Sequence, residues 1–233
     1  MNIELTDPSV ENEAAGCDGP ALSVSERTYQ ALLDRIAARQ IGPGEVLEER
    51  RLAEELNVSR TPMRAALNRL LGEGILKRLS NGSVVVHAFG VTELLELLQI
   101  RQLLEGQAAA MAAGRIPGDK LAAVKARLED VMRYSAAGGE STWTADNEVH
   151  ELVAAYCGNK SMAAMIADAR RRARLCNVER LSQRAVQARA EHLAIVQALQ
   201  AGDAEQARAT MTAHLGAVRR AFARTLGYLP HED

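Results

Sequence analysis

The sequence predicts a mostly α-helical protein, with an N-terminal helix-turn-helix and hairpin followed by an all-helical antiparallel bundle. From Leu47 to Val86, two short segments with helical spacing of apolar residues precede an Asn-Gly pair flanked by residues that favour strands. Beyond Val91, Leu, Ala, Arg and Glu dominate, and strand-forming residues are sparse. Glycine-containing breaks divide this second half into segments of helical length.

The N-terminal domain is predicted to begin with a helix at Ser23, which forms a Ser-x-x-Glu capping pattern with Glu26. The expected buried face of this helix consists of Tyr29, Leu32, Leu33 and Ile36. After a turn at residues 42–44, a second helix is expected from Glu48 to Leu56. Asn57 should end that helix in a left-handed conformation.

The next helix carries a basic face. Ser59 is expected to cap its N-terminus through the hydroxyl group. Its buried stripe should contain Met63, Leu67, Leu70 and Leu71. Arg60, Arg64 and Asn68 share another face, on which we expect no acidic neighbour. Arginine and asparagine can bond to base edges in the major groove of DNA, so this face is the expected DNA reader.

The rest of the domain supports that interpretation. Strands are expected at residues 75–79 and 83–86, joined by a two-residue turn at Asn81-Gly82 with positive φ angles. Helix, turn, helix and hairpin in this order are typical of a winged helix-turn-helix. Residues 50–80 hold seven basic and three acidic residues, whereas residues 91–233 hold 18 and 17. A structural helical hairpin with a solvated charged face is the alternative.

Domain boundaries follow from these patterns. We expect a disordered acidic tail at residues 1–22, a winged helix-turn-helix domain at 23–86, a connector at 87–90 and a helical domain at 91–228. The helices of the last domain are expected at Val91–Ala113, Pro117–Ala137, Ser141–Cys157, Lys160–Leu181, Ala185–Ala201 and Asp203–Leu226. The sequence has neither an apolar run of about 20 residues nor the pattern of a signal peptide, which predicts a cytoplasmic protein without membrane association. Cys17, Cys157 and Cys176 lack metal-type spacing and suit a reducing compartment.

Polar residues on the inward stripes of three predicted helices suggest a metal site. Asp146 and His150 lie one helical turn apart, and His192 and His214 lie on the apolar stripes of later helices. Three imidazoles and one carboxylate suit a divalent ion, Zn²⁺ above all, with Ni²⁺ or Mn²⁺ as alternatives. Ordinary buried histidines are the other interpretation. His87 and His231 lack such a setting and are expected to be exposed to solvent.

Two stretches of the chain resemble known families. GEVLEERRLAEELNVSRTPMRAAL is similar to the GntR-family pattern GxLxExxLAxxLxVSRTPVREAL. IRQLLEGQAAAMAA, DNEVH, EHLAIVQAL and MTAHL resemble the FCD domain, the ligand-binding domain of the FadR-type branch of that family. Residue 149 is Val where many relatives have Phe, which concerns packing or pocket shape rather than metal ligation.

The resemblance implies a bacterial transcription regulator that binds a palindromic operator in double-stranded DNA as a homodimer. The positions that match the family's DNA contacts are Arg50, Ser59, Arg60, Thr61 and Arg64, with Gly82 at the wing. Those that match its metal ligands are Asp146, His150, His192 and His214. Arg101 matches an arginine that holds the carboxylate of the effector, for which a small organic acid is expected. Without the resemblance, Arg101 and Glu105 would be interpreted as a surface ion pair.

Two other functions remain open at this stage. A metal sensor, in which the ion itself is the signal, would use the same ligands. A metal-dependent hydrolase would also use histidine and carboxylate ligands, with an open position for water. We expect no enzyme, because the sequence shows no acid–base residue with a clear role near the ligands and an enzyme would have no use for a DNA reader.

Overall fold

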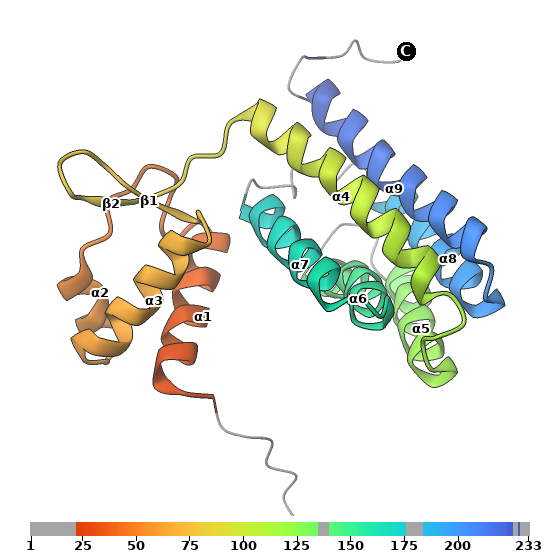
Figure 1. Cartoon of the computed structure of the whole chain (residues 1–233), viewed down its shortest axis with the longest axis horizontal. Helices are drawn as coiled ribbons and strands as arrows, with labels where there is room; N and C mark the ends of the chain where they lie inside the picture. The colour runs from red at the N-terminus through yellow and green to blue at the C-terminus, as the bar shows by residue number, and fades with distance from the viewer. Residues whose placement is uncertain (1–21, 135–139, 176–183, 226–227, 229–233) are drawn as a thin grey trace, which may run out of the picture.

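The computed structural model describes residues 22–134, 140–175, 184–225 and 228. Residues 131–134, 140–146 and 185 are described by their backbone alone. The acidic tail up to residue 21, together with Cys17, Cys176 and His231, therefore lies outside the described residues. Figure 1 shows two bodies joined by an extended connector, with the end of one bundle helix lying toward the N-terminal body.

The N-terminal body contains α1 (Val24–Ala37), α2 (Glu49–Glu55), α3 (Arg60–Gly72), β1 (Leu76–Arg78) and β2 (Val84–Val86). The predicted order of helices and strands is confirmed. The Ser23 hydroxyl accepts a hydrogen bond from the backbone N–H of Glu26 at 3.1 Å, as the capping pattern predicts. The residues predicted for the buried face of α1 are all buried. Of the predicted stripe on α3, Met63, Leu67 and Leu70 are buried and Leu71 is half-buried.

Two expectations about α3 and the turn before it have different outcomes. Asn57 ends the preceding segment with a φ of 50°, the left-handed conformation expected of it. Ser59 occupies the N-cap position with extended backbone, but its hydroxyl makes no capping hydrogen bond. The prediction of a capping hydroxyl was therefore wrong. The Ser59 side chain is exposed to solvent.

The hairpin is formed, but not with the turn that was expected. The N–H of Gly82 donates to the carbonyl of Leu79 at 2.9 Å, and the N–H of Leu79 donates to the carbonyl of Ser83 at 2.8 Å. Gly82 has a φ of 86°, whereas Asn81 does not adopt a positive φ. The loop thus has three residues, a turn followed by a left-handed glycine that forms a bulge. A further bridge pairs Val46 with Val85, which the sequence pattern did not predict.

The second body is a bundle of long helices. Their bounds are α4 Val91–Ala112, α5 Gly118–Tyr134, α6 Glu140–Tyr156, α7 Lys160–Leu175, α8 Ala185–Ala201 and α9 Ala204–Thr225. The predicted helical bundle is confirmed, with ends that differ by a few residues. The expected continuations of α5 to residue 137, of α7 to residue 181 and of α9 to residue 226 lie outside the described residues.

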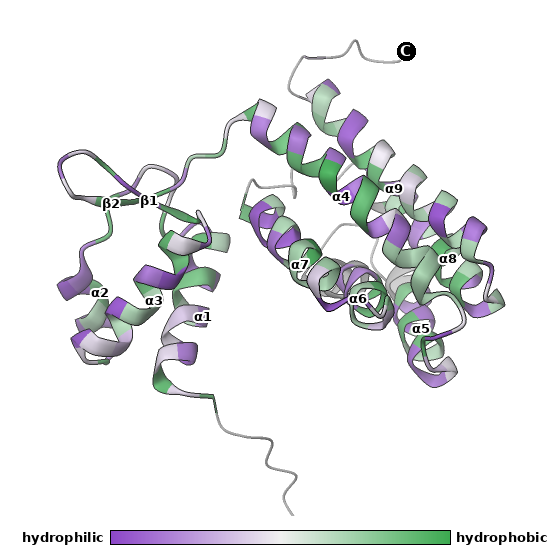
Figure 2. Cartoon of the chain, in the orientation of Figure 1, coloured by the Kyte–Doolittle hydropathy of each residue, from purple (hydrophilic) through white to green (hydrophobic). Residues whose placement is uncertain are grey.

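The bundle is held together by an apolar core. Leu128, Val153, Ile195, Leu199 and Met211 are almost completely buried there, and Val149 and Cys157 pack in the same cluster. Figure 2 shows hydrophobic and hydrophilic residues interspersed along the helices, as amphipathic helices require. The antiparallel helices α4 and α9 pack closely, and a side chain at Gly106 would collide with the Thr212 hydroxyl. None of the helices in the described residues is long and apolar enough to cross a membrane.

The connector corrects the prediction for His87. Its side chain is buried rather than exposed to solvent. The ring stacks on Phe89 with centroids 4.1 Å apart, and Nδ1 lies 3.0 Å from the carbonyl oxygen of Gly74. Its Nε2 lies 3.4 Å from Glu93 at the start of α4. The connector folds back against the end of α3, a contact that the local sequence does not reveal.

Candidate functional site

The predicted DNA-reading side chains of α3 are exposed. Arg60, Thr61, Arg64 and Asn68 all lie on the surface, as does Gly82 at the tip of the hairpin. Arg50 of α2 lines one open hollow together with Ser59 and Arg60. The fold therefore brings the arginine of α2 and the start of α3 to one surface, although Arg50 and Arg60 are 10 positions apart in the chain.

The basic face has acidic neighbours, contrary to expectation. Arg64 Nε lies 3.6 Å from a carboxylate oxygen of Glu49, and Arg50 Nε lies 3.0 Å from one of Glu54. The prediction considered only residues on α3 itself, whereas both acids belong to α2. These pairs are exposed, and exposed pairs contribute about 0–1 kcal/mol, so a DNA phosphate can replace the carboxylate at small cost.

Inside the bundle, three of the four predicted metal ligands lie together. His150, His192 and His214 come from α6, α8 and α9, and a ligand atom from each lies within 4.8 Å of the others. The Nε2 atoms of His150 and His192 are 3.2 Å apart. Two nitrogen ligands in a tetrahedral Zn²⁺ site would be about 3.3 Å apart, given Zn–N distances of about 2.0–2.1 Å. The histidine geometry thus fits a metal ion. Asp146 lies on α6, but its side chain is outside the described residues.

Two carboxylates orient the histidine rings. His150 Nδ1 lies 2.5 Å from Glu105 on α4, and His214 Nδ1 lies 2.7 Å from Glu191 on α8. With Nδ1 carrying the hydrogen toward the carboxylate, Nε2 of each ring presents its lone pair to the centre of the cluster. Carboxylate–histidine pairs of this kind orient metal-bound imidazoles and make them more basic.

The electrostatics keep these rings neutral. Burial lowers the pKa of His150 to about 3, although Glu105 opposes the shift. Burial also lowers the pKa of His214 well below its ordinary value. Burial alone would raise the pKa of Glu105, but the charge of Arg101 and the contact with His150 outweigh it and hold that pKa far below its usual range. Neutral imidazoles beside ionised carboxylates are the protonation states that a divalent cation needs.

Arg101 lies beside this cluster. Its Nε donates to Glu105 at 2.6 Å, and both side chains are buried, with exposed fractions of 8 % and 0 %. The ion pair that spacing suggested is therefore present, but it lies in the interior and not on the surface. Among the contacts that the structure describes for Arg101, the hydrogen bond to Glu105 uses Nε. The two terminal amino groups can therefore donate to a ligand.

Several site residues were missed in the sequence. Glu105 was considered only as a surface partner of Arg101, and its spacing of four residues was the one available signal. Glu191 contacts His214 across two helices, so no local spacing identifies it. Arg170 on α7 donates to the side chain and the carbonyl of Asn147, and burial lowers its pKa to about 10, so it stays charged. Helical periodicity places such residues inward, but it does not pair them.

Comparisons with known proteins agree with both halves of the structure. Residues 24–86 match the family of bacterial regulatory proteins described as gntR, and residues 96–217 match the FCD domain. The Nta operon transcriptional regulator of Aminobacter aminovorans is 37% identical over 83 residues, which cover 36% of this chain and 40% of that protein. The matched region thus spans less than half of that relative's length.

Solved structures share the fold. E. coli McbR/YncC superposes with a TM-score of 0.75 at 20% sequence identity, and the superposition covers 89% of this chain and 100% of that chain. The Zn²⁺-bound FCD domain of TM0439 superposes with a TM-score of 0.51 at 22% identity, over 61% of this chain and 99% of that one. At these identities the likeness establishes the fold.

The matched families and the named relative are transcriptional regulators and not enzymes, which removes the hydrolase alternative. The first match covers the winged helix-turn-helix with its exposed basic helix, and the second covers most of the helical bundle with its buried histidine cluster. The chain belongs to the GntR family of bacterial transcription regulators, in the branch that carries an FCD domain.

Proposed function

We propose that the protein regulates transcription in response to a small organic acid, bound beside a divalent metal ion in the bundle. The observation that carries the proposal is the convergence of His150, His192 and His214 next to the buried Arg101–Glu105 pair. The ion, for which Zn²⁺ is favoured over Ni²⁺ and Mn²⁺, would be held by the three histidines together with Asp146. A fold neighbour described as Zn²⁺-bound supports this assignment.

The acid would be held by the ion and by Arg101. When bound, the ion would supply positive charge to one carboxylate oxygen, and the guanidinium of Arg101 can donate to the other. Arg101 and the three histidines are buried, so an anion that reaches both the metal and the guanidinium must be small. This geometry favours a short carboxylate over a bulky acyl group.

DNA binding would use two copies of the chain. In a homodimer, two α3 helices can enter successive major grooves, and a palindromic operator then mirrors the two-fold symmetry. The acid changes DNA affinity only by binding the two states of the dimer unequally, with a coupling of typically about 1–3 kcal/mol. Arg50, Arg60, Thr61 and Arg64 are the side chains that we assign to DNA contacts.

A metal sensor is the second candidate, because the same histidines would serve it. The two functions differ in which addition changes DNA affinity. We would select operator duplexes from a random pool, and then measure affinity with metal-stripped protein, with Zn²⁺ and with Zn²⁺ plus a panel of small carboxylates. For a sensor, Zn²⁺ alone should give the full shift in affinity and the carboxylates should add nothing, whereas for the acid regulator a carboxylate should shift the affinity beyond the level reached with Zn²⁺ alone.

The metal site is tested by replacing His192 with alanine. His192→Ala should lose most of the bound Zn²⁺ in elemental analysis, because one of the three clustered ligands is removed. His87→Ala is the matched control, since it also removes a buried histidine but lies outside the cluster. Full zinc occupancy in His192→Ala, or an equal loss in both variants, would contradict the proposed site.

A further inference from the structure

Helix α7 contacts both bodies of the molecule. It packs on α4 and α6 in the bundle, and its last residue, Leu175, is buried in the apolar core of the N-terminal body. The carbonyl of Leu175 accepts a hydrogen bond from Arg39, just after α1, at 3.0 Å. In Figure 1, this end of α7 lies on the side of the bundle nearest to α1 and α3. The helix therefore joins the two bodies through packing, independently of the connector at residues 87–90.

On one side, α7 reaches the wall of the histidine cluster. Arg170 is partly buried, donates to Asn147 one turn before His150, and is attracted by the charge of Glu105. Glu105 in turn holds the ring of His150. A movement of α6 therefore acts on the side chain of Arg170 through its hydrogen bonds to Asn147.

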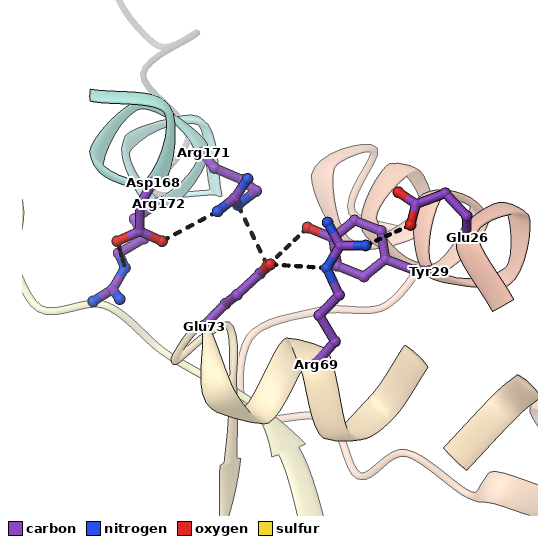
Figure 3. Close-up of polar contacts among 7 residues, drawn as sticks. All are labelled: Glu26, Tyr29, Arg69, Glu73, Asp168, Arg171 and Arg172. Carbon is purple, nitrogen blue, oxygen red and sulfur yellow. Dashed lines mark hydrogen bonds and ion pairs between the residues drawn. The ribbon is translucent and has the colours of Figure 1, made fainter. Parts of the chain in front are cut away.

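On its other side, α7 contacts the end of α3, the helix to which we assign the DNA contacts and which we call the recognition helix. Arg171 Nε lies 3.4 Å from a carboxylate oxygen of Glu73, the residue that ends α3. The same oxygen accepts a hydrogen bond from the hydroxyl of Tyr29 at 2.7 Å, and Arg69 Nε lies 3.1 Å from the other oxygen. Figure 3 shows Glu73 at the centre of this network, between Arg171 on one side and Tyr29 and Arg69 on the other.

Because Arg170 and Arg171 are adjacent on α7, their side chains can contact different neighbours. Consecutive side chains on an α-helix diverge by about 100°, because a turn takes 3.6 residues. Arg170 can thus face the cluster while Arg171 faces α3, and a rigid helix moves both together. Asp168 restrains the side of α7 that carries Arg171, because it pairs with Arg171 at 3.3 Å and with Arg172 at 2.9 Å.

The geometry points to α7 as the element that carries the state of the metal and effector pocket to the recognition helix, through Arg170 at the pocket and the Arg171–Glu73 pair at α3. The inference rests on the proposed function, because the pocket supplies the signal. Ordering of the histidine cluster repositions α6 and Glu105, Arg170 follows, and Arg171 transmits the movement to Glu73. Arg171 is a positioning residue here, since it touches neither the pocket nor the DNA-reading face.

Hydrogen-exchange mass spectrometry tests this coupling, with Zn²⁺ alone as the probe and the full-length, metal-stripped protein as the sample. In the wild type, Zn²⁺ should slow amide exchange in α6 and α9 and also change exchange at the end of α3, around residues 70–75. In Arg171→Gln, the response of α6 and α9 should persist while the response at the end of α3 is lost. Glu73→Gln removes the other partner and should give the same loss.

Arg174→Gln is the matched control, because Arg174 is an exposed arginine on the same helix. It should keep both responses. A response at the end of α3 that persists in Arg171→Gln and Glu73→Gln would overturn the coupling, as would its absence in the wild type while α6 and α9 respond. If Zn²⁺ changed exchange nowhere in the wild type, the proposed metal site itself would fail, and the signal assigned to α7 would be lost with it.

Discussion

Replacing Glu105 with glutamine is expected to destabilise the bundle strongly. The carboxylate is completely buried, 2.6 Å from Arg101 Nε and 2.5 Å from His150 Nδ1. Glutamine keeps nearly the same volume but removes the negative charge, which leaves the guanidinium of Arg101 buried without its counter-ion. Removal of one partner from a buried ion pair costs about 3–5 kcal/mol.

This magnitude can be measured by urea unfolding of metal-free protein, followed by circular dichroism. For an m value of about 2–3 kcal/mol/M, the loss corresponds to a fall in the unfolding midpoint of about 1–2.5 M. The same variant should bind Zn²⁺ about 10- to 100-fold more weakly, because Glu105 orients the His150 ring. Calorimetric titration of the folded variant measures that second effect.

The matched control is Glu129→Gln. Glu129 pairs with Lys125 at 3.9 Å on α5, also with a spacing of four residues, but the two side chains are 42% and 37% exposed. Exposed pairs contribute about 0–1 kcal/mol, so the midpoint of this variant should barely move. If the midpoint of Glu105→Gln fell no further than that of Glu129→Gln, the argument that burial makes the Arg101–Glu105 pair indispensable would be refuted.

Three further predictions concern the N-terminal body. Arg60→Ala should weaken binding to a selected operator by about 1–3 kcal/mol if the side chain bonds to a base, whereas Arg174→Ala should not; equal affinities in fluorescence anisotropy would exclude that role. Burial raises the pKa of Tyr29 to about 12, so the folded state keeps a proton that the unfolded chain releases near pH 10. The free energy of unfolding should therefore fall as pH rises from about 10 to about 12, and Tyr29→Phe should abolish the part of the fall that Tyr29 causes. Identical pH profiles of the wild type and the variant would contradict this assignment to Tyr29. Gly82→Ala should cost about 1 kcal/mol in chemical unfolding, because Gly82 has a φ of 86°, and an unchanged stability would argue against strain there.

The sequence predicted the site to the extent that helical periodicity determines it. His150, His192 and His214 were placed inward because they continue stripes that include Val153, Val196 and Met211, and all three of those apolar residues are buried. Periodicity assigns a residue to one side of its own helix. It does not say which residue of another helix lies opposite, and for this reason Glu191 was missed as the partner of His214.

The same distinction explains two of the wrong predictions. His87 was expected to be exposed because it lies in the connector, without the inward helical setting of the bundle histidines, yet Phe89 and the end of α3 cover it. The basic face of α3 was expected to lack acidic neighbours because α3 itself carries no acidic residue on that face, yet α2 brings Glu49 to Arg64. Both of these errors concern a contact between elements, whereas the errors about the Ser59 cap and the hairpin turn are local.

The helices, the winged helix-turn-helix and the inward positions of His150, His192 and His214 follow from the amino-acid sequence, because turn residues and apolar spacing act locally along the chain. The burial of Glu105 between Arg101 and His150, and the contacts of α7 with both Asn147 and Glu73, depend on how the helices pack. Charges interact across space according to burial and packing angle. Those quantities arise when the helices pack, and no periodicity within one segment encodes them.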